Sequence, residues 1–243
     1  MERKKVWVVV GASGGIGSAF GRLVSAQAPA DEVIATASST ERLVGVDWAW
    51  ASQPLDLRNE ASIQAFAEWC DRQASHVDRL IVASGVLTQD EHRPEKRISE
   101  ARLDQLQSAN LVNATGPVLL TAALEPLLKR AEQPRVVYLS AQVGSIGDNH
   151  LGGWIGYRMS KAALNMGVRT VAIELGRWRN QPLVAAVHPG TTATELSRRY
   201  VARRPVPPRS AEETAARLWR FVDSMSEEHH GGFFTLEGQP LPW

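Results

Sequence analysis

A tyrosine and a lysine four residues apart carry the most specific chemistry in this sequence. Tyr157-Arg-Met-Ser-Lys161 lies near the start of a segment with helical spacing, residues 154–178. A spacing of four places both side chains on one face of a helix, one turn apart. A tyrosine ionises near pH 10 in water, and a neighbouring ammonium favours the phenolate and lowers the pKa. The pair therefore predicts an acid–base couple, although the same spacing is common on the surfaces of amphipathic helices.

A glycine cluster near the N-terminus is the second chemical signal. Gly11-Ala-Ser-Gly-Gly-Ile-Gly17 directly follows the apolar run of residues 6–10 and overlaps the start of a helical segment. Glycines there let the backbone approach a pyrophosphate, and the helix N-terminus offers amide donors to it. The spacing fits either Gly-x3-Gly-x-Gly or Gly-x2-Gly-x2-Gly, so the cluster alone leaves the chemistry open. A nucleoside-triphosphate loop is disfavoured because no Lys followed by Ser or Thr closes the cluster.

Short continuous apolar runs alternate with helical segments along the chain. Such runs are typical of parallel strands buried on both faces, and the alternation favours βαβ crossovers. We therefore predict one doubly wound α/β domain of Rossmann type over residues 1–243, with a mainly parallel sheet. The predicted strands are residues 6–10, 33–37, 80–83, 136–139, 184–187 and 233–236, and the predicted helices are residues 15–27, 60–74, 99–129 with an interruption near Gly116-Pro117, 154–178, and one that begins at the capping box Ser210-Ala-Glu-Glu213.

Composition excludes several classes of protein. Lys and Arg number 27 against 26 Asp and Glu, so no chain-wide charge favours nucleic acid. The single cysteine, Cys70, cannot form an internal disulfide, and the six histidines are scattered, so we expect no metal site. No apolar run is long enough to span a bilayer, and the short run after the N-terminal Lys-Lys is too short for a signal peptide. We expect a cytoplasmic protein that acts on a small molecule.

Five motifs in this order resemble the short-chain dehydrogenase/reductase family. They are the glycine cluster, Asp56-Leu57 at the position that follows the third strand in the family, an Asn in the third helical segment, the Tyr-x3-Lys pair, and a Pro-Gly turn. More narrowly, Gly144-Ser-Ile146 and Gly152-Gly-Trp154 resemble the branch of C-factor and sniffer-type carbonyl reductases. The resemblance covers nearly the whole chain and implies an NAD(P)(H)-dependent oxidoreductase.

The resemblance also implies roles for individual residues. Tyr157 would exchange a proton with the substrate oxygen, and Lys161 would bind the nicotinamide ribose and lower the pKa of Tyr157. Asn113 would hold a water in a proton relay to Lys161. Trp154 would lie near the substrate. The implied cofactor-binding residues are Gly11, Ser13, Gly15, Ile16, Gly17, Ser38, Asp56, Leu57, Ser84, Gly85, Tyr157, Lys161, Pro189, Gly190, Thr192 and Thr194.

Three positions depart from the family pattern. Ala83-Ser84-Gly85 stands where Asn-Ala-Gly is usual, and Val10 replaces a threonine before the glycine cluster. Ala141 occupies the place of the family's catalytic Ser, just after the predicted strand 136–139, and strand alternation points the preceding Ser140 to the opposite face. We take Ser145, on the following loop, as the fourth catalytic residue and the substitute for the missing hydroxyl.

Cofactor choice depends on the end of the second strand. An acidic residue there would bind the ribose diol of NAD, but this chain has Ser38-Ser-Thr40 instead. Arg42 is close enough to be considered for a 2′-phosphate. The sequence therefore favours NADP(H) over NAD(H).

Two other functions remain open at this point. A nucleotide-sugar epimerase or dehydratase shares the glycine cluster and Tyr-x3-Lys, but it needs a substrate domain for which little chain remains after Lys161. A dinucleotide-binding signalling or regulatory protein with little turnover is the alternative from another class.

The resemblance further implies a homodimer or homotetramer built through residues 99–129 and 154–178. The charge-dense segment 89–97 is either a border of the substrate pocket or a solvated loop.

Overall fold

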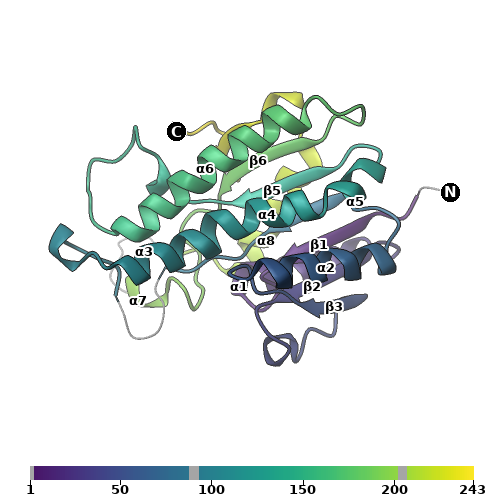
Figure 1. Ribbon diagram of the computed structural model, residues 1–243, viewed down its shortest axis with the longest axis horizontal. Coiled ribbons are helices and arrows are strands. Elements are labelled where there is room, and N and C mark those ends of the chain that lie inside the picture. Colours follow the sequence, from purple (N-terminus) through teal and green to yellow (C-terminus); the bar gives the residue numbers. More distant parts are fainter. Residues whose placement is uncertain (1–2, 88–92, 202–206) are drawn as a thin grey trace.

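A seven-stranded, entirely parallel sheet forms the centre of the protein, in the order β3-β2-β1-β4-β5-β6-β7. The computed structural model describes residues 3–87, 93–201 and 207–243. Figure 1 shows the strands running side by side between two layers of helices. The predicted doubly wound fold is thereby confirmed. The strands are β1 (Val6–Val10), β2 (Glu32–Ala37), β3 (Ala51–Pro54), β4 (Arg79–Val82), β5 (Arg135–Leu139), β6 (Leu183–His188) and β7 (Gly232–Thr235).

The side chains of the central strand alternate between two hydrophobic cores. Val6, Val8 and Val10 of β1 pack into the core beneath α2, α4 and α6, whereas Trp7 and Val9 pack beneath α1 and α8. A strand buried on both faces has no polar side, which is why β1 reads as an unbroken apolar run. The helices are α1 (Gly15–Gln27), α2 (Glu60–Gln73), α3 (Leu103–Asn110), α4 (Gly116–Ala123), α5 (Glu125–Arg130), α6 (Ile155–Leu175), α7 (Arg198–Val201) and α8 (Ala211–Ser224).

The edge strand β3 was missing from the predicted apolar runs. Its sequence is Ala-Ser-Gln-Pro, and every one of these residues is at least partly exposed. An edge strand beside β2 alone needs no apolar side chains on both faces, and its last residue, Pro54, is tolerated because one side of an edge strand forms no ladder.

The predicted long helix over residues 99–129 is divided into several pieces. A turn of π-helix, Leu111–Thr115, separates α3 from α4, and α5 follows after Leu124. In an α-helix the carbonyl of Asn113 would accept the amide of residue 117, but Pro117 has no N–H. The loss of that donor accounts for the widened turn at the predicted interruption.

The capping box at Ser210 is half confirmed. The Ser210 hydroxyl accepts the amide of Glu213 at 3.0 Å at the start of α8. The Glu213 carboxylate instead bonds Arg217, one turn along the helix.

Within the described ranges, no helix is both long and apolar enough to cross a membrane.

Candidate active site

The glycine cluster folds into a tight turn between β1 and α1 at the carboxyl edge of the sheet. Gly11 has a φ of +85°, and a Cβ placed there would lie 2.8 Å from the amide nitrogen of Ser84, just beyond β4. A Cβ on Gly17 would lie 2.2 Å from the carbonyl oxygen of Gly11. Side chains at either position would force the turn open. The glycines therefore hold the start of α1 close against the neighbouring strand, with its amides free to meet an anion.

The segment after β6 closes the other side of this turn. A Cβ on Gly15 would lie 2.7 Å from the Cγ2 methyl of Thr194, so the two segments touch. Gly190 turns the chain with a φ of +73°, and the Thr192 hydroxyl bonds the hydroxyl of Thr214 in α8 at 2.9 Å. The Pro-Gly turn and the glycine cluster, almost 180 residues apart in sequence, thus form one cradle.

Two buried hydroxyls beside this cradle have no hydrogen-bond partner among the described residues, those of Thr36 and Ser84. Thr36 ends its strand against the turn, since its carbonyl accepts the amides of Gly11 and Ala12. Buried polar groups are normally satisfied, so orphaned hydroxyls next to an open cradle suit a polar ligand. A dinucleotide fits this donor set: backbone amides for its phosphates and hydroxyls for its sugars.

Asp56, which the family resemblance predicts to bind the cofactor, is bonded to Arg58 in the structure. Both carboxylate oxygens of Asp56 accept from Arg58, at 2.9 and 2.8 Å, and this hydrogen bond lowers the pKa of Asp56. Leu57 is buried, and a Cβ on Gly116 would lie 2.6 Å from its Cβ, so it packs under the start of α4. Ser13 and Ser38 are exposed, and Ile16 is half-buried.

Tyr157 and Lys161 lie one turn apart on α6, as the spacing predicts. The Lys161 ammonium is 3% exposed, donates to the carbonyl of Leu139 at 2.8 Å, and lies 5.9 Å from the centre of the Tyr157 ring. It also lies 3.6 Å from where a Cβ on Gly85 would be, which connects it to the cofactor cradle. The pair and the cradle therefore share one edge of the sheet.

The expected lowering of the tyrosine pKa is not found in the structure. Burial raises the pKa of Tyr157 to about 12 and lowers the pKa of Lys161 to about 8. Desolvation disfavours the charged form of each group and outweighs the attraction of the ammonium for the phenolate. Because Lys161 donates to the Leu139 carbonyl, its proton is aimed at the backbone of β5.

Asn113 is fully buried, and its side chain forms hydrogen bonds with two other segments of the chain. Its Oδ1 accepts the amide of Val86 at 2.8 Å, while its Nδ2 donates to the Val86 carbonyl and to the Ser160 hydroxyl, at 2.8 and 2.9 Å. Both side-chain protons are used, so the side-chain amide has no donor left for a water. A water beside Asn113 would therefore have to donate to an acceptor, either the second lone pair of Oδ1 or the main-chain carbonyl, for which Pro117 offers no amide donor.

The Ser145 hydroxyl also has hydrogen-bond partners within the protein. Its hydroxyl donates to the carbonyl of Trp243 at 3.1 Å and accepts the amide of Asp148, so its one proton is used in this structure. The Ser140 hydroxyl donates to the side-chain carbonyl of Asn165 on α6, the helix that also carries Tyr157 and Lys161. A Cβ on Gly144 would lie 2.6 Å from the Cβ of Lys161, so the loop that carries Ser145 rests directly on α6.

Two residues that the sequence did not identify as functional, Glu95 and Tyr200, lie with Trp154 around Tyr157. Glu95 is 4% exposed, and its carboxylate accepts the amide of Gly156 at the start of α6. Trp154, with φ at +52°, packs edge-on against Tyr157 at 6.3 Å, and Tyr200 of α7 packs against Trp154 at 5.3 Å. Trp154 thus lies beside Tyr157, and its expected place near the substrate stays a prediction. Of segment 89–97, residues 89–92 lie outside the described residues.

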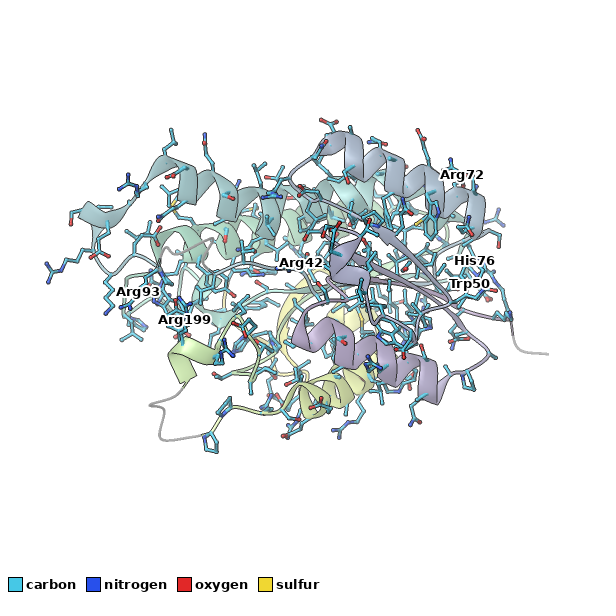
Figure 2. All side chains as sticks on the ribbon, turned by 90° about the horizontal axis from the view of Figure 1, so that it is seen from below. Arg42, Trp50, Arg72, His76, Arg93 and Arg199 are labelled. Atoms are coloured by element: carbon cyan, nitrogen blue, oxygen red, sulfur yellow. The ribbon has the colours of Figure 1, made fainter. Side chains whose placement is uncertain are left out.

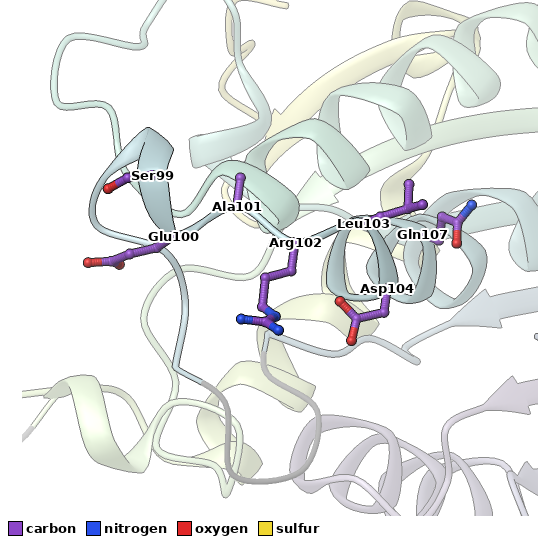
Figure 3. Close-up of a pocket in the computed structure, with 7 residues that line it drawn as sticks. All are labelled: Ser99, Glu100, Ala101, Arg102, Leu103, Asp104 and Gln107. Atoms are coloured by element: carbon purple, nitrogen blue, oxygen red, sulfur yellow. The ribbon is translucent and has the colours of Figure 1, made fainter.

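A separate surface hollow of about 550 Å³ lies at the start of α3 (Figure 3). Its lining contains Arg102 and Asp104 but neither Tyr157 nor Lys161.

The two consecutive histidines near the C-terminus have structural contacts: His229 bonds Ser226, and His230 bonds the carbonyl of Ala172.

Comparisons with known proteins agree with this arrangement. A sequence model of the short chain dehydrogenases matches residues 5–205. C-signal of Myxococcus xanthus is 35% identical over 133 residues, 54% of this chain and 75% of that protein. A 1-hydroxy-2-glutathionyl-2-methyl-3-butene dehydrogenase of Rhodococcus sp. (strain AD45) is 27% identical over 236 residues, 97% of this chain and 98% of that protein. The structure of an NADPH-bound carbonyl reductase from chicken fatty liver matches with a TM-score of 0.86 and 25% identity, over 100% of this chain and 96% of that one.

The family match spans the glycine cluster, Asn113, the Tyr157–Lys161 pair and the Pro-Gly turn. The similarity to C-signal agrees with the narrower resemblance to the C-factor branch. Together with the fold, these findings show that the chain belongs to the short-chain dehydrogenase family of oxidoreductases.

Proposed function

We propose that this protein is an NADP(H)-dependent carbonyl reductase, or the matching alcohol dehydrogenase, in which Tyr157 exchanges the proton. The observation that carries the proposal is the convergence of the Tyr157–Lys161 pair with the glycine cradle at one sheet edge, linked through Gly85. The dehydrogenase and the carbonyl reductase among the relatives favour an enzyme over the dinucleotide-binding regulator.

Tyr157 suits proton donation at neutral pH. With a pKa of about 12, its hydroxyl is protonated over the whole physiological range. It can therefore hydrogen-bond a carbonyl oxygen and give up its proton as that oxygen becomes an alkoxide. When bound, the nicotinamide supplies the hydride.

Lys161 and Asn113 position this chemistry. Lys161, with a pKa of about 8, is mostly charged at neutral pH and presents an ammonium close to Gly85 and the cradle, where it would meet a ribose. Asn113 fixes the backbone at Val86 and the hydroxyl of Ser160, one residue before Lys161. We assign the water of the proton relay to the main-chain carbonyl of Asn113.

We propose Ser145 as the hydroxyl that assists Tyr157, on the condition that its bond to Trp243 breaks when substrate enters. Support comes from its place on the loop that rests against Lys161. If Ser145→Ala leaves the turnover of a good substrate unchanged, this assignment is wrong.

The preference for NADP(H) rests on the end of β2. Arg42 is exposed and has no hydrogen-bond or ion-pair partner among the described residues, and Ser38 beside it is exposed too. Figure 2 labels Arg42 between the two ends of the molecule. A guanidinium free to pair with a phosphate favours the phosphorylated ribose.

The enzymatic proposal is tested with two readouts on the wild-type protein. Energy transfer from tryptophan to bound NADPH reports binding, and NADPH oxidation over a panel of ketones, aldehydes and quinones reports turnover. We expect both. Binding without turnover of any compound would favour the regulatory alternative.

We also propose a homodimer or homotetramer built through α3, α4 and α6. Met159, Met166 and Ile173 repeat every seven residues on α6 and are 57, 68 and 51% exposed. Leu103 of α3 and Leu119 of α4 are likewise exposed, at 72 and 37%. An apolar stripe of this kind suits a second copy. Sedimentation of wild type and Met166→Glu should show an assembly that the charge dissociates; a monomeric wild type would overturn this.

A further inference from the structure

Two segments that are distant in sequence converge on Trp154 at the entrance to the site. The carbonyl of Glu95 accepts the amide of Trp154, and the ring of Tyr200 packs on the Trp154 ring at 5.3 Å. Trp154 in turn packs against Tyr157 at 6.3 Å. The segment around Glu95 and helix α7 therefore both border the pair formed by Trp154 and Tyr157.

Each of these segments carries an exposed arginine next to its contact residue. Arg93 lies two residues before Glu95, and Arg199 directly precedes Tyr200. Neither side chain has a hydrogen bond or ion pair within the described part of the chain. Figure 2 shows both at one end of the molecule, with Arg72 and His76 at the opposite end.

Among the described residues, the acidic groups nearest in sequence to these arginines have other partners. Glu195 is paired with Arg198 at 2.7 Å, and the Glu95 carboxylate is buried against the amide of Gly156. Glu100 accepts the amide of Lys96. Lys96 and Arg97 add further positive charge on the same segment as Arg93.

Guanidinium groups on two sides of an entrance suit a negatively charged group on the molecule that enters. Arginine binds carboxylate and phosphate through paired, charge-assisted hydrogen bonds. A cluster of one sign also raises the local concentration of an oppositely charged substrate. The rings of Trp154 and Tyr200, which pack on each other beside Tyr157, suit the apolar body of that molecule.

We propose that the substrate carries, at a distance from its reacting carbonyl, a carboxylate or phosphate group that Arg93 and Arg199 bind. This inference rests on the proposed reductase function and names the class of its substrate. The uncharged body lies against Trp154, and the carbonyl reaches Tyr157.

Three aldehydes with the same aromatic body test the proposal: para-formylbenzoate, its methyl ester, and para-formylphenyl phosphate. We measure kcat and KM for each with NADPH, and binding of each to the enzyme–NADP+ complex by calorimetry. Wild type should prefer one or both anions to the ester, and rising salt should remove the preference. The two anions distinguish a carboxylate site from a phosphate site.

Arg199→Gln and Arg93→Gln should each raise KM for the preferred anion about fivefold, the effect expected for one partly exposed ion pair, and leave the ester unchanged. Arg72→Gln is the matched control, because it removes the same charge from an exposed arginine at the far end of the molecule (Figure 2). It should leave all three substrates unaffected.

Equal binding of the ester and both anions to wild type would overturn the proposal, as would an anion preference that survives both substitutions. Failure of the reductase function has a different signature. In that case no aldehyde is reduced, while the calorimetric preference for an anion and its loss in Arg199→Gln would still be seen.

Discussion

The cofactor side and the substrate side of the site are built from different kinds of contact. On the cofactor side, backbone meets backbone: Gly11 lies against Ser84, Gly17 against Gly11, and Gly15 against Thr194. On the substrate side, the rings of Trp154, Tyr157 and Tyr200 meet one another. Backbone contacts at glycines tolerate no side chain, whereas side-chain contacts can change without moving the sheet. We therefore expect the fold to fix the geometry of the cofactor side, whereas changes of side chain on the substrate side can alter which substrate binds.

Removing the Tyr157 hydroxyl should separate the two sides most sharply. Loss of a positioned proton donor costs about 10²–10⁴-fold in rate, so Tyr157→Phe should lower kcat by that factor. NADPH binding should stay unchanged, because the cradle is built from other residues. Tyr200→Phe loses a similar hydroxyl beside the same tryptophan and is the control. Equal kcat values for Tyr157→Phe and wild type would refute the assigned role.

A methyl group inside the glycine turn should damage the cofactor side. In Gly17→Ala the new Cβ would lie 2.2 Å from the Gly11 oxygen, and the turn must open. A clash of about 3 kcal/mol corresponds to roughly hundredfold weaker NADPH binding. Gly147→Ala, where a Cβ meets its nearest neighbour at 3.4 Å, should bind NADPH normally. Fluorescence titration of both variants measures this, and equal affinities would contradict the steric account.

Stability should depend on pH through Lys161, which links the two sides. Its pKa is about 8 in the folded protein and about 10.5 when unfolded, so between these values the unfolded chain binds more protons. Stability from this group therefore rises with pH across that window. Relative to Lys161→Met, wild type should gain about 2 kcal/mol between about pH 8 and pH 10. Urea unfolding of the pair gives the difference, and a constant or falling value would show that the ammonium is not desolvated.

Cofactor preference should change least. Arg42→Ala removes a cation proposed to pair with the 2′-phosphate and should weaken NADPH binding about tenfold, the effect of one charged hydrogen bond. NADH lacks that phosphate, so its affinity should not change. Arg72→Ala controls for the loss of net charge. Tighter binding of NADH than NADPH by wild type would reverse the assignment.

The same contrast explains what could be predicted from the sequence. The unbroken apolar run of β1 and the spacing of Gly11 to Gly17 are visible in the local sequence, and the fold and family expectations that rest on them were confirmed. Burial is not local: it changed the sign expected for the pKa of Tyr157 and placed the charged Glu95 inside.

Contacts between distant segments were also beyond sequence reasoning. Ser145 bonds a carbonyl 98 residues away, and Asn113 reaches Ser160 across 47 residues. The family resemblance gave these residues chemical roles, but it could not show that their side-chain protons are already used.

The central claim is that hydride passes from the nicotinamide to the substrate carbonyl, and an isotope label on the cofactor follows that transfer directly. Wild-type protein is given para-formylbenzoate and NADPH that carries deuterium at both transferable positions of the nicotinamide ring. We predict one deuterium on the carbinol carbon of the product by mass spectrometry and NMR, and none there with Tyr157→Phe over the same time. An alcohol product without deuterium, or no alcohol from any carbonyl in the panel, would contradict the account.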